Sequence, residues 1–155
     1  QALAARERLC DELDALAAGG GSAEEAHVRD QWAAIAEVPA PWEKRMAARR
    51  DAALKALADG DADGHRARID KASAARALGL LELEMALGIE SPPELQQQRL
   101  ALQVAKLRER FKSAGSTPAD EPPERLLAWC AAPGIAERRD RERFDRILGR
   151  LGPAR

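Results

Sequence analysis

Apolar side chains recur along most of the chain at intervals of three and four residues, which is the period of an amphipathic α-helix. No segment needs to be interpreted as a strand. The first stripe begins at Leu3 or Ala2 and continues through Ala5, Leu9, Leu13 and Leu16. It ends at three consecutive glycines, residues 19–21, which supply the backbone conformations that helix C-caps favour. The pattern therefore predicts an N-terminal helix that stops at these glycines.

Two further helices are predicted before residue 60. Ser22 lies three residues before Glu25, which is a capping-box pattern for a second helix start. The buried face of that helix would carry Val28, Trp32 and Ile35. Pro39 ends it, and Pro41 suits the first turn of a third helix, where a missing N–H costs nothing. The stripe of the third helix is Trp42, Met46, Ala53 and Leu57, with Gly60 as its C-cap.

The fourth predicted helix is the longest, beginning between Asp61 and His65 and ending at Leu87. Its apolar face follows a heptad-like step through Ile69, Ala72, Arg76, Leu80, Leu83 and Leu87. The part from 77 to 89 is apolar on nearly every side, with only Glu82 and Glu84 charged. A helix with this pattern is covered by neighbours on more than one flank.

The remaining chain divides into three helices. The first restarts at residues 91–94 and carries the stripe Leu100, Val104, Leu107 and Phe111. Residues 115–123 are rich in Gly, Ser and Pro and form the best internal boundary. A short helix over 124–132 and a last one over 137–148 follow, the latter with Phe144, Ile147 and Leu151 on its face. We therefore expect a main bundle over 1–114, a linker over 115–123 and a C-terminal hairpin over 124–155 packed on the bundle.

These elements predict an all-α bundle of about six or seven helices, antiparallel because the connections are short. The expected core consists of Trp32, Trp42, Ile69, Leu80, Leu83, Leu87, Leu100, Val104, Leu107 and Phe111.

Composition supports helix and restricts the compartment. The 155 residues include no Tyr and few β-formers, and Ala and Leu dominate the hydrophobic 45%. The 25 basic and 26 acidic residues exclude a globally basic nucleic-acid binder. Cys10 and Cys130 lie far apart, which is typical of a reduced, cytosolic chain rather than a disulfide framework. No apolar run is long enough for a membrane span, no signal peptide is visible, and the start at Gln1 suggests a piece of a longer polypeptide.

The sharpest local motif lies between residues 59 and 70. Asp59, Asp61, Asp63, Gly64 and Asp70 match positions one, three, five, six and twelve of an EF-hand calcium loop. Three features argue against calcium binding. Position eight is the cation Arg66, position twelve is Asp70 where a bidentate Glu is usual, and the sequence has no second loop to pair with this one. The alternative is a helix-to-helix turn with Gly60 as C-cap and an aspartate as N-cap, which we favour.

Other chemistry-bearing residues have structural interpretations. His27 and His65 show no zinc-ligand spacing and are expected on solvated helix faces. Cys10 and Cys130 lie in apolar stretches and are expected in the core. Glu82 and Glu84 point to different sides of one helix, so we expect one to pair with an arginine and the other to reach solvent. No catalytic, cofactor-binding or metal-binding residue is predicted, and no cofactor.

Two basic clusters remain. The one over 138–150 is interleaved with acids, which indicates intrahelical pairs on a solvated face. The other, Lys44, Arg45, Arg49 and Arg50, is less compensated and offers a hypothetical phosphate-binding face. No aromatic residue is interleaved for base stacking, and no nucleotide-binding loop is present.

Two stretches resemble the bacterial domain-of-unknown-function family 349. The first is DQWAAIAEVP, residues 30–39, followed by Trp42, Arg45 and Asp51. The second is Glu82-Leu83-Glu84, then GIESPPE over 88–94, and then Arg99, Leu102, Gln103, Val104 and Leu107. The likeness covers roughly residues 5–112. It implies helical hairpins within a long cytosolic protein and offers no catalytic residue.

The sequence therefore predicts a non-enzymatic interaction or scaffold module of a larger cytosolic bacterial protein. Its partner would be another protein or the rest of its own chain, with neither a membrane nor a small-molecule substrate involved. The alternative is weak nucleic-acid binding through Lys44, Arg45, Arg49 and Arg50.

Overall fold

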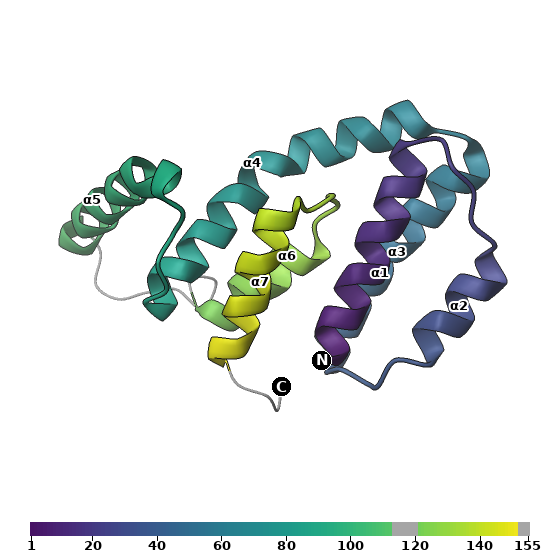
Figure 1. Cartoon of the computed structure of the whole chain (residues 1–155), viewed down its shortest axis with the longest axis horizontal. Coiled ribbons are helices and arrows are strands. Elements are labelled where there is room, and N and C mark those ends of the chain that lie inside the picture. Colours follow the sequence, from purple (N-terminus) through teal and green to yellow (C-terminus); the bar gives the residue numbers. More distant parts are fainter. Residues whose placement is uncertain (113–120, 152–155) are drawn as a thin grey trace.

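The computed structural model describes residues 1–112 and 121–151, and all regular structure in these residues is helical. The elements are α1 (Ala2–Ala18), α2 (Glu25–Ala33), α3 (Ala40–Asp59), α4 (Ala62–Leu87), a 3₁₀ turn η1 (Pro93–Leu95), α5 (Gln96–Lys112), α6 (Pro122–Ala131) and α7 (Arg138–Leu151) (Figure 1). The all-α prediction is confirmed. Most of the predicted linker, residues 115–120, lies outside the described residues.

Helix ends follow the predicted chemistry at most positions. Gly60 ends α3 with φ of 65°, in the left-handed region that glycine favours. Asp61 is the N-cap of α4, and its carboxylate accepts a hydrogen bond from the Gly64 N–H at 3.0 Å. Pro41 lies in the first turn of α3 as predicted. The predicted capping box at Ser22 is wrong: α2 has Glu24 at its N-cap and no side-chain cap, because the helix begins further along the chain.

The first and third helices run parallel, not antiparallel. Contacts from α1 to α3 advance in the same direction along both, from Arg6 with Glu43, through Cys10 with Met46, to Asp14 with Arg49. The reason is that α2 carries the chain back along the outside of the pair, so the connection is a whole helix instead of a short loop (Figure 1).

The long helix α4 joins two parts of one core. Its first half packs beside α1 and α3, and its second half lies against α6 and α7 (Figure 1). The core contains residues from α1, α2, α3, α4, α6 and α7, among them Cys10, Met46, Leu83, Cys130 and Ile147. Trp129 of α6 stacks on Phe144 of α7, with ring centroids 4.6 Å apart. The two C-terminal helices thus share a core with the helices before residue 114.

The predicted core is right for some residues and wrong for others. Trp32, Leu80 and Leu83 are buried as predicted. Trp42 and Leu87 are half-buried at the edge of the core, and Ile69 is half-buried without packing against it. The four residues from α5, namely Leu100, Val104, Leu107 and Phe111, are exposed. Their prediction as core is wrong, because α5 turns its other side toward the bundle.

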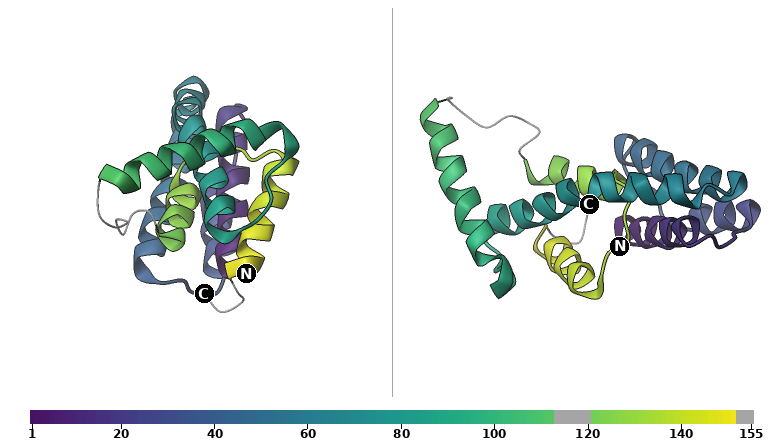
Figure 2. Two further views of the ribbon diagram at one scale, coloured as in Figure 1. Left: turned by 90° about the vertical axis from the view of Figure 1, so that its left-hand side faces the viewer. Right: turned by 90° about the horizontal axis from the view of Figure 1, so that it is seen from above.

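The α5 helix lies across one end of an elongated molecule, as seen from above in Figure 2. It packs mainly against η1 and α4. Arg99 anchors it by donating to the Ile89 carbonyl at 2.5 Å and to Ser91 Oγ at 2.8 Å, and Lys106 pairs with Glu82 at 3.6 Å. Polar contacts therefore fix the inner side of this helix and leave its apolar stripe pointing outward.

Candidate functional site

A cluster of charged side chains lies in the interior, and Arg49 is at its centre. The Arg49 Nε donates to Asp14 Oδ2 at 2.9 Å, and its Nη1 lies 3.3 Å from Glu7 Oε1. The same guanidinium donates to the Cys130 and Gly134 carbonyls at 2.9 Å each. All three charged side chains are fully buried. We call Glu7, Asp14, Arg49, His65, Arg76 and Arg141 the buried charge cluster.

Asp14 uses both carboxylate oxygens within this cluster. Its Oδ1 lies 2.8 Å from His65 Nε2, and its Oδ2 also accepts from the Gly134 N–H at 3.0 Å. The prediction that His65 is solvated is wrong, since it is fully buried, while His27 is exposed as predicted. Extending the stripe of α4 back one step from Ile69 reaches His65, so the periodicity contains the signal for its burial.

Acids and guanidiniums offset one another throughout the cluster. Glu7 also contacts Arg141 and lies 3.8 Å from Arg76, and Arg141 in turn pairs with Asp11 at 2.8 Å. Desolvation acts to lower the pKa of Arg49, but Asp14, Cys10 and Glu7 outweigh it and the pKa is raised. Desolvation together with Arg49 lowers the pKa of Arg76 to about 10. Both guanidiniums therefore stay charged at neutral pH.

The two cysteines lie beside this cluster and are buried, as predicted for core residues. Cys10 Sγ is 3.7 Å from the Met46 carbonyl. Burial raises the pKa of the Cys10 thiol to about 12, and it also raises the pKa of Cys130. Because both thiols are neutral and covered, they are poorly suited to nucleophilic chemistry. The buried charge cluster connects α1, α3, α4 and the segment before α7.

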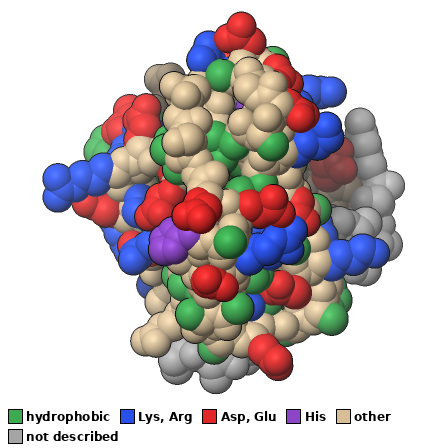
Figure 3. Space-filling model, turned by 90° about the vertical axis from the view of Figure 1, so that its right-hand side faces the viewer, with side chains coloured by type: hydrophobic (Ala, Val, Ile, Leu, Met, Phe, Trp, Pro, Cys, Tyr) green, Lys and Arg blue, Asp and Glu red, His purple; other side chains and the backbone are tan. Residues whose placement is uncertain are grey.

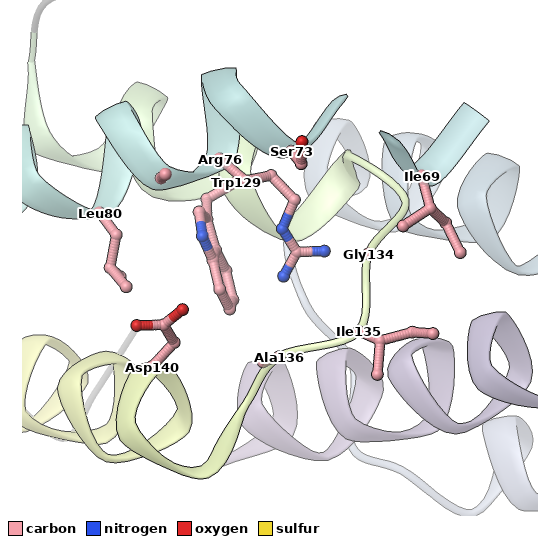
Figure 4. A pocket seen from close by; sticks show the side chains of 10 residues that line it. Ile69, Ser73, Arg76, Leu80, Trp129, Gly134, Ile135, Ala136 and Asp140 are labelled. Carbon is pink, nitrogen blue, oxygen red and sulfur yellow. The ribbon is translucent and has the colours of Figure 1, made fainter. Parts of the chain in front are cut away.

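A small cavity lined by Arg76 of the cluster lies between α4, α6 and the start of α7 (Figure 4). The guanidinium of Arg76 lies over the Trp129 ring, 4.2 Å from its centroid, and both side chains line the cavity. Ile69, Ser73, Leu80, Ile135 and Asp140 line the rest. The cavity is about 140 Å³, below the roughly 300 Å³ that small-molecule sites usually offer.

A second, wider hollow of about 430 Å³ follows the crossing of α4 and α6. Arg45, Leu78 and Arg125 line it together with Glu82. Arg125 forms an ion pair with Glu82, so opposite charges meet across this hollow. It offers no field of one sign to attract an ionic ligand.

The predicted basic face of α3 is not assembled on the surface. Lys44 and Arg45 are exposed, but Arg49 points inward to Asp14. Arg50 lies over the Trp32 ring at 4.7 Å and pairs with Asp51 at 2.9 Å. A phosphate backbone would therefore meet two of the four predicted cations. Figure 3, which views the end of the molecule opposite α5, shows acidic and basic side chains intermixed there.

The aspartates between 59 and 70 serve the turn between α3 and α4. Asp59 pairs with Lys55 at 3.0 Å, and Asp63 pairs with Arg66 at 3.1 Å. With Gly60 as C-cap and Asp61 as N-cap, the favoured helix-to-helix turn is confirmed. Within residues 1–112 and 121–151, no three His, Cys, Asp or Glu side chains are placed to hold a metal ion together.

Both acids in the apolar half of α4 form ion pairs. Glu84 is fully buried and receives Arg143 of α7 at 2.5 and 3.1 Å, and Ser91 Oγ donates to it at 3.0 Å. Glu82 pairs with Arg125 and Lys106. The prediction that one of the two acids pairs with an arginine is confirmed. The prediction that the other reaches solvent is wrong, because Glu82 is also held in ion pairs. The predicted solvated face of α7 is likewise only partial, since Arg143 is buried although Arg138 and Glu142 pair on the surface.

Among the described residues, the outer face of α5 gathers apolar side chains that the fold leaves exposed. Its four apolar side chains are exposed by 60% at Leu100, 42% at Val104, 54% at Leu107 and 91% at Phe111. They follow one another at steps of four, three and four residues, which places them on one side of the helix. The stripe itself was visible in the sequence, but its exposure was not. Adjacent exposed apolar side chains mark interaction surfaces in folded proteins.

Comparison with known proteins adds no identification. No family model, no curated protein and no solved structure matches this chain. Among the residues that the structure describes, none of the helices combines the length and the apolar character needed to cross a bilayer. The outer face of α5 is therefore the candidate functional site on structural grounds alone.

Proposed function

We propose that this chain is a non-enzymatic helical interaction module that binds a partner through the outer face of α5. The observation that carries this proposal is the exposure of Leu100, Val104, Leu107 and Phe111 together on one side of a regular helix. Burying these four side chains would recover apolar free energy at about 25 cal/mol per Å². A helix with such a face is a common element of protein recognition.

The rest of the molecule supports a scaffold role. The buried charge cluster and the core of α1, α3, α4, α6 and α7 hold α4 in place, and α4 with η1 carries α5. The thiols and the buried histidine are covered by other side chains and serve packing in this proposal. A cytosolic setting in a longer bacterial protein, and kinship with the domain-of-unknown-function family 349, remain part of the proposal and agree with a module of this kind.

Site-specific photo-crosslinking tests the proposal. A photoreactive amino acid replaces Val104 in the intact parent protein, and the matched control replaces Lys71, an exposed residue on α4. We expect an adduct from position 104 to another protein or to another region of the parent chain, and none from position 71.

The adduct must also depend on the apolar face. Combining the probe at position 104 with Leu107→Ser and Phe111→Ser should abolish it, because two apolar anchors next to the contact are removed. An adduct that survives these substitutions, or equal adducts from positions 71 and 104, overturns the proposal.

A further inference from the structure

The apolar face of α5 is a narrow seam and not a broad surface. At about 100° per residue, Leu100, Val104, Leu107 and Phe111 fall within roughly 60° of arc around the helix. Gln97 and Gln103 lie directly beside them on either side. Their steps of four and three residues are those of coiled-coil a and d positions, with Val104 and Phe111 at a and Leu100 and Leu107 at d. β-Branched residues at a with leucine at d favour pairing of two helices.

The seam is flanked by positive charge in its C-terminal half. Arg108 and Arg110 lie on opposite sides of it, each about 80° from its centre by the same helical geometry. Glu109 lies on the side of the helix away from the seam. The corresponding positions in the N-terminal half, one heptad earlier, are the uncharged residues Ala101 and Gln103. A partner laid along the seam would therefore meet uncharged groups at one end and two guanidiniums at the other.

This charge pattern discriminates between three occupants. A second copy of the chain would place arginines beside arginines in a parallel pair, and beside Ala101 and Gln103 in an antiparallel pair. Neither arrangement gives Arg108 and Arg110 an acidic partner. An anionic membrane surface would attract the two arginines. However, helices that lie in a membrane surface present a wide apolar face, and the seam of α5 is narrow. A single partner helix fits the narrow seam, and acidic residues beside its own apolar stripe would pair with Arg108 and Arg110.

We propose that the partner of α5 is an acidic amphipathic helix, which carries Leu or Ile along its seam and Glu or Asp beside it where it meets Arg108 and Arg110. This inference rests on the proposed function, because it specifies what binds the same face. The seam covers residues 100–111, which is less than two heptads, so the pairing is expected to be weak and reversible when the partner helix has no other contacts.

Three synthetic helical peptides test the charge requirement. All share leucine at a and d over about three heptads, and their e and g positions carry Glu, Gln or Lys. Binding to the full chain is measured by fluorescence anisotropy at low ionic strength. We expect the Glu peptide to bind about tenfold or more tightly than the Lys peptide, with the Gln peptide between them.

Two protein variants are compared with the unaltered chain. Leu107→Ser should weaken binding of the Glu peptide about tenfold, because it removes a central seam contact from an exposed site. The pair Arg108→Glu and Arg110→Glu leaves the seam intact and should reverse the preference to the Lys peptide. Circular dichroism confirms that each variant keeps its helices. Equal binding of the Glu and Lys peptides, or a preference that survives the charge reversal, overturns the inference.

Two further measurements separate this inference from the proposed function. If the chain binds phosphatidylserine vesicles through Leu107 and ignores the Glu peptide, the occupant is a membrane and the helix partner is refuted. If sedimentation shows a dimer that Leu107→Ser dissociates, the occupant is a second copy and the helix partner is again refuted. The proposed function fails separately, when position 104 gives no crosslinked adduct in the parent protein.

Discussion

Arg49 and Asp14 form a fully buried ion pair, with the Arg49 Nε 2.9 Å from Asp14 Oδ2. The pair connects α3 to α1 at the point where these parallel helices also meet α4, through the contact of Asp14 with His65. Since Arg49 also donates to the carbonyls of Cys130 and Gly134, one side chain links four parts of the chain. The cluster sets the positions of helices that the hydrophobic stripes alone leave free to slide.

Removing Arg49 should destabilise the fold strongly. Arg49→Met keeps much of the side-chain volume but leaves Asp14 and Glu7 buried without their shared guanidinium. Breaking a buried pair in this way costs about 3–5 kcal/mol. Urea denaturation followed by circular dichroism measures the change. The matched control is Lys55→Met, which breaks the exposed pair with Asp59 and should cost under about 0.5 kcal/mol. Similar losses in both variants would refute the importance of the cluster.

Cys10 should make the fold sensitive to alkaline pH. Its pKa is about 12 in the folded chain, against a usual 9.0, so the folded chain retains a proton that the unfolded chain releases. Its contribution is therefore complete below about pH 9 and is lost as the pH rises toward 12. Between about pH 8 and 11 the free energy of unfolding should fall by about 3 kcal/mol through this thiol alone.

Cys10→Ala isolates the effect of this thiol. Other groups, including Arg76 with its pKa near 10, titrate in both proteins and largely cancel in the comparison. The measurement is the slope of unfolding free energy against pH in urea, not its value at one pH. Parallel slopes for the two proteins would show that Cys10 ionises as readily in the folded chain as in the unfolded chain.

Two glycines should respond to alanine in opposite directions. Gly79 lies within α4, and a Cβ there would meet no atom within 4 Å, so Gly79→Ala should stabilise the fold by about 0.5–1 kcal/mol through helix propensity. Gly60 also has open space around it, but its φ is +65°, so Gly60→Ala should destabilise by about 1 kcal/mol. Thermal unfolding of both variants shows whether each substitution raises or lowers the stability. Equal signs would refute the interpretation of Gly60 as a C-cap that needs glycine.

The sequence predicts the helices well because each depends on local spacing and caps. The stripe of α4 through Leu80 and Leu83, and the turn at Gly60 and Asp61, needed no knowledge of the neighbours. The burial of Arg49 could not be predicted in the same way, because a charged residue is buried only when its partners arrive from distant helices. The seam of α5 shows the converse, since an apolar stripe predicts a partner without stating whether the same chain supplies it.

The two phenylalanines of this chain provide the sharpest test of that distinction. Phe144 is fully buried and stacks on Trp129, so Phe144→Ala should cost about 3–5 kcal/mol through lost burial and a cavity. Phe111 has the same side chain at the C-terminal end of an equally clear stripe, yet 91% of it is exposed. Phe111→Ala should therefore change the free energy of unfolding by less than about 0.5 kcal/mol. Urea denaturation of both variants under the same conditions gives the comparison. A large loss for Phe111→Ala would mean that the face of α5 is covered within the isolated chain, and then it could not serve as the docking surface for a partner helix.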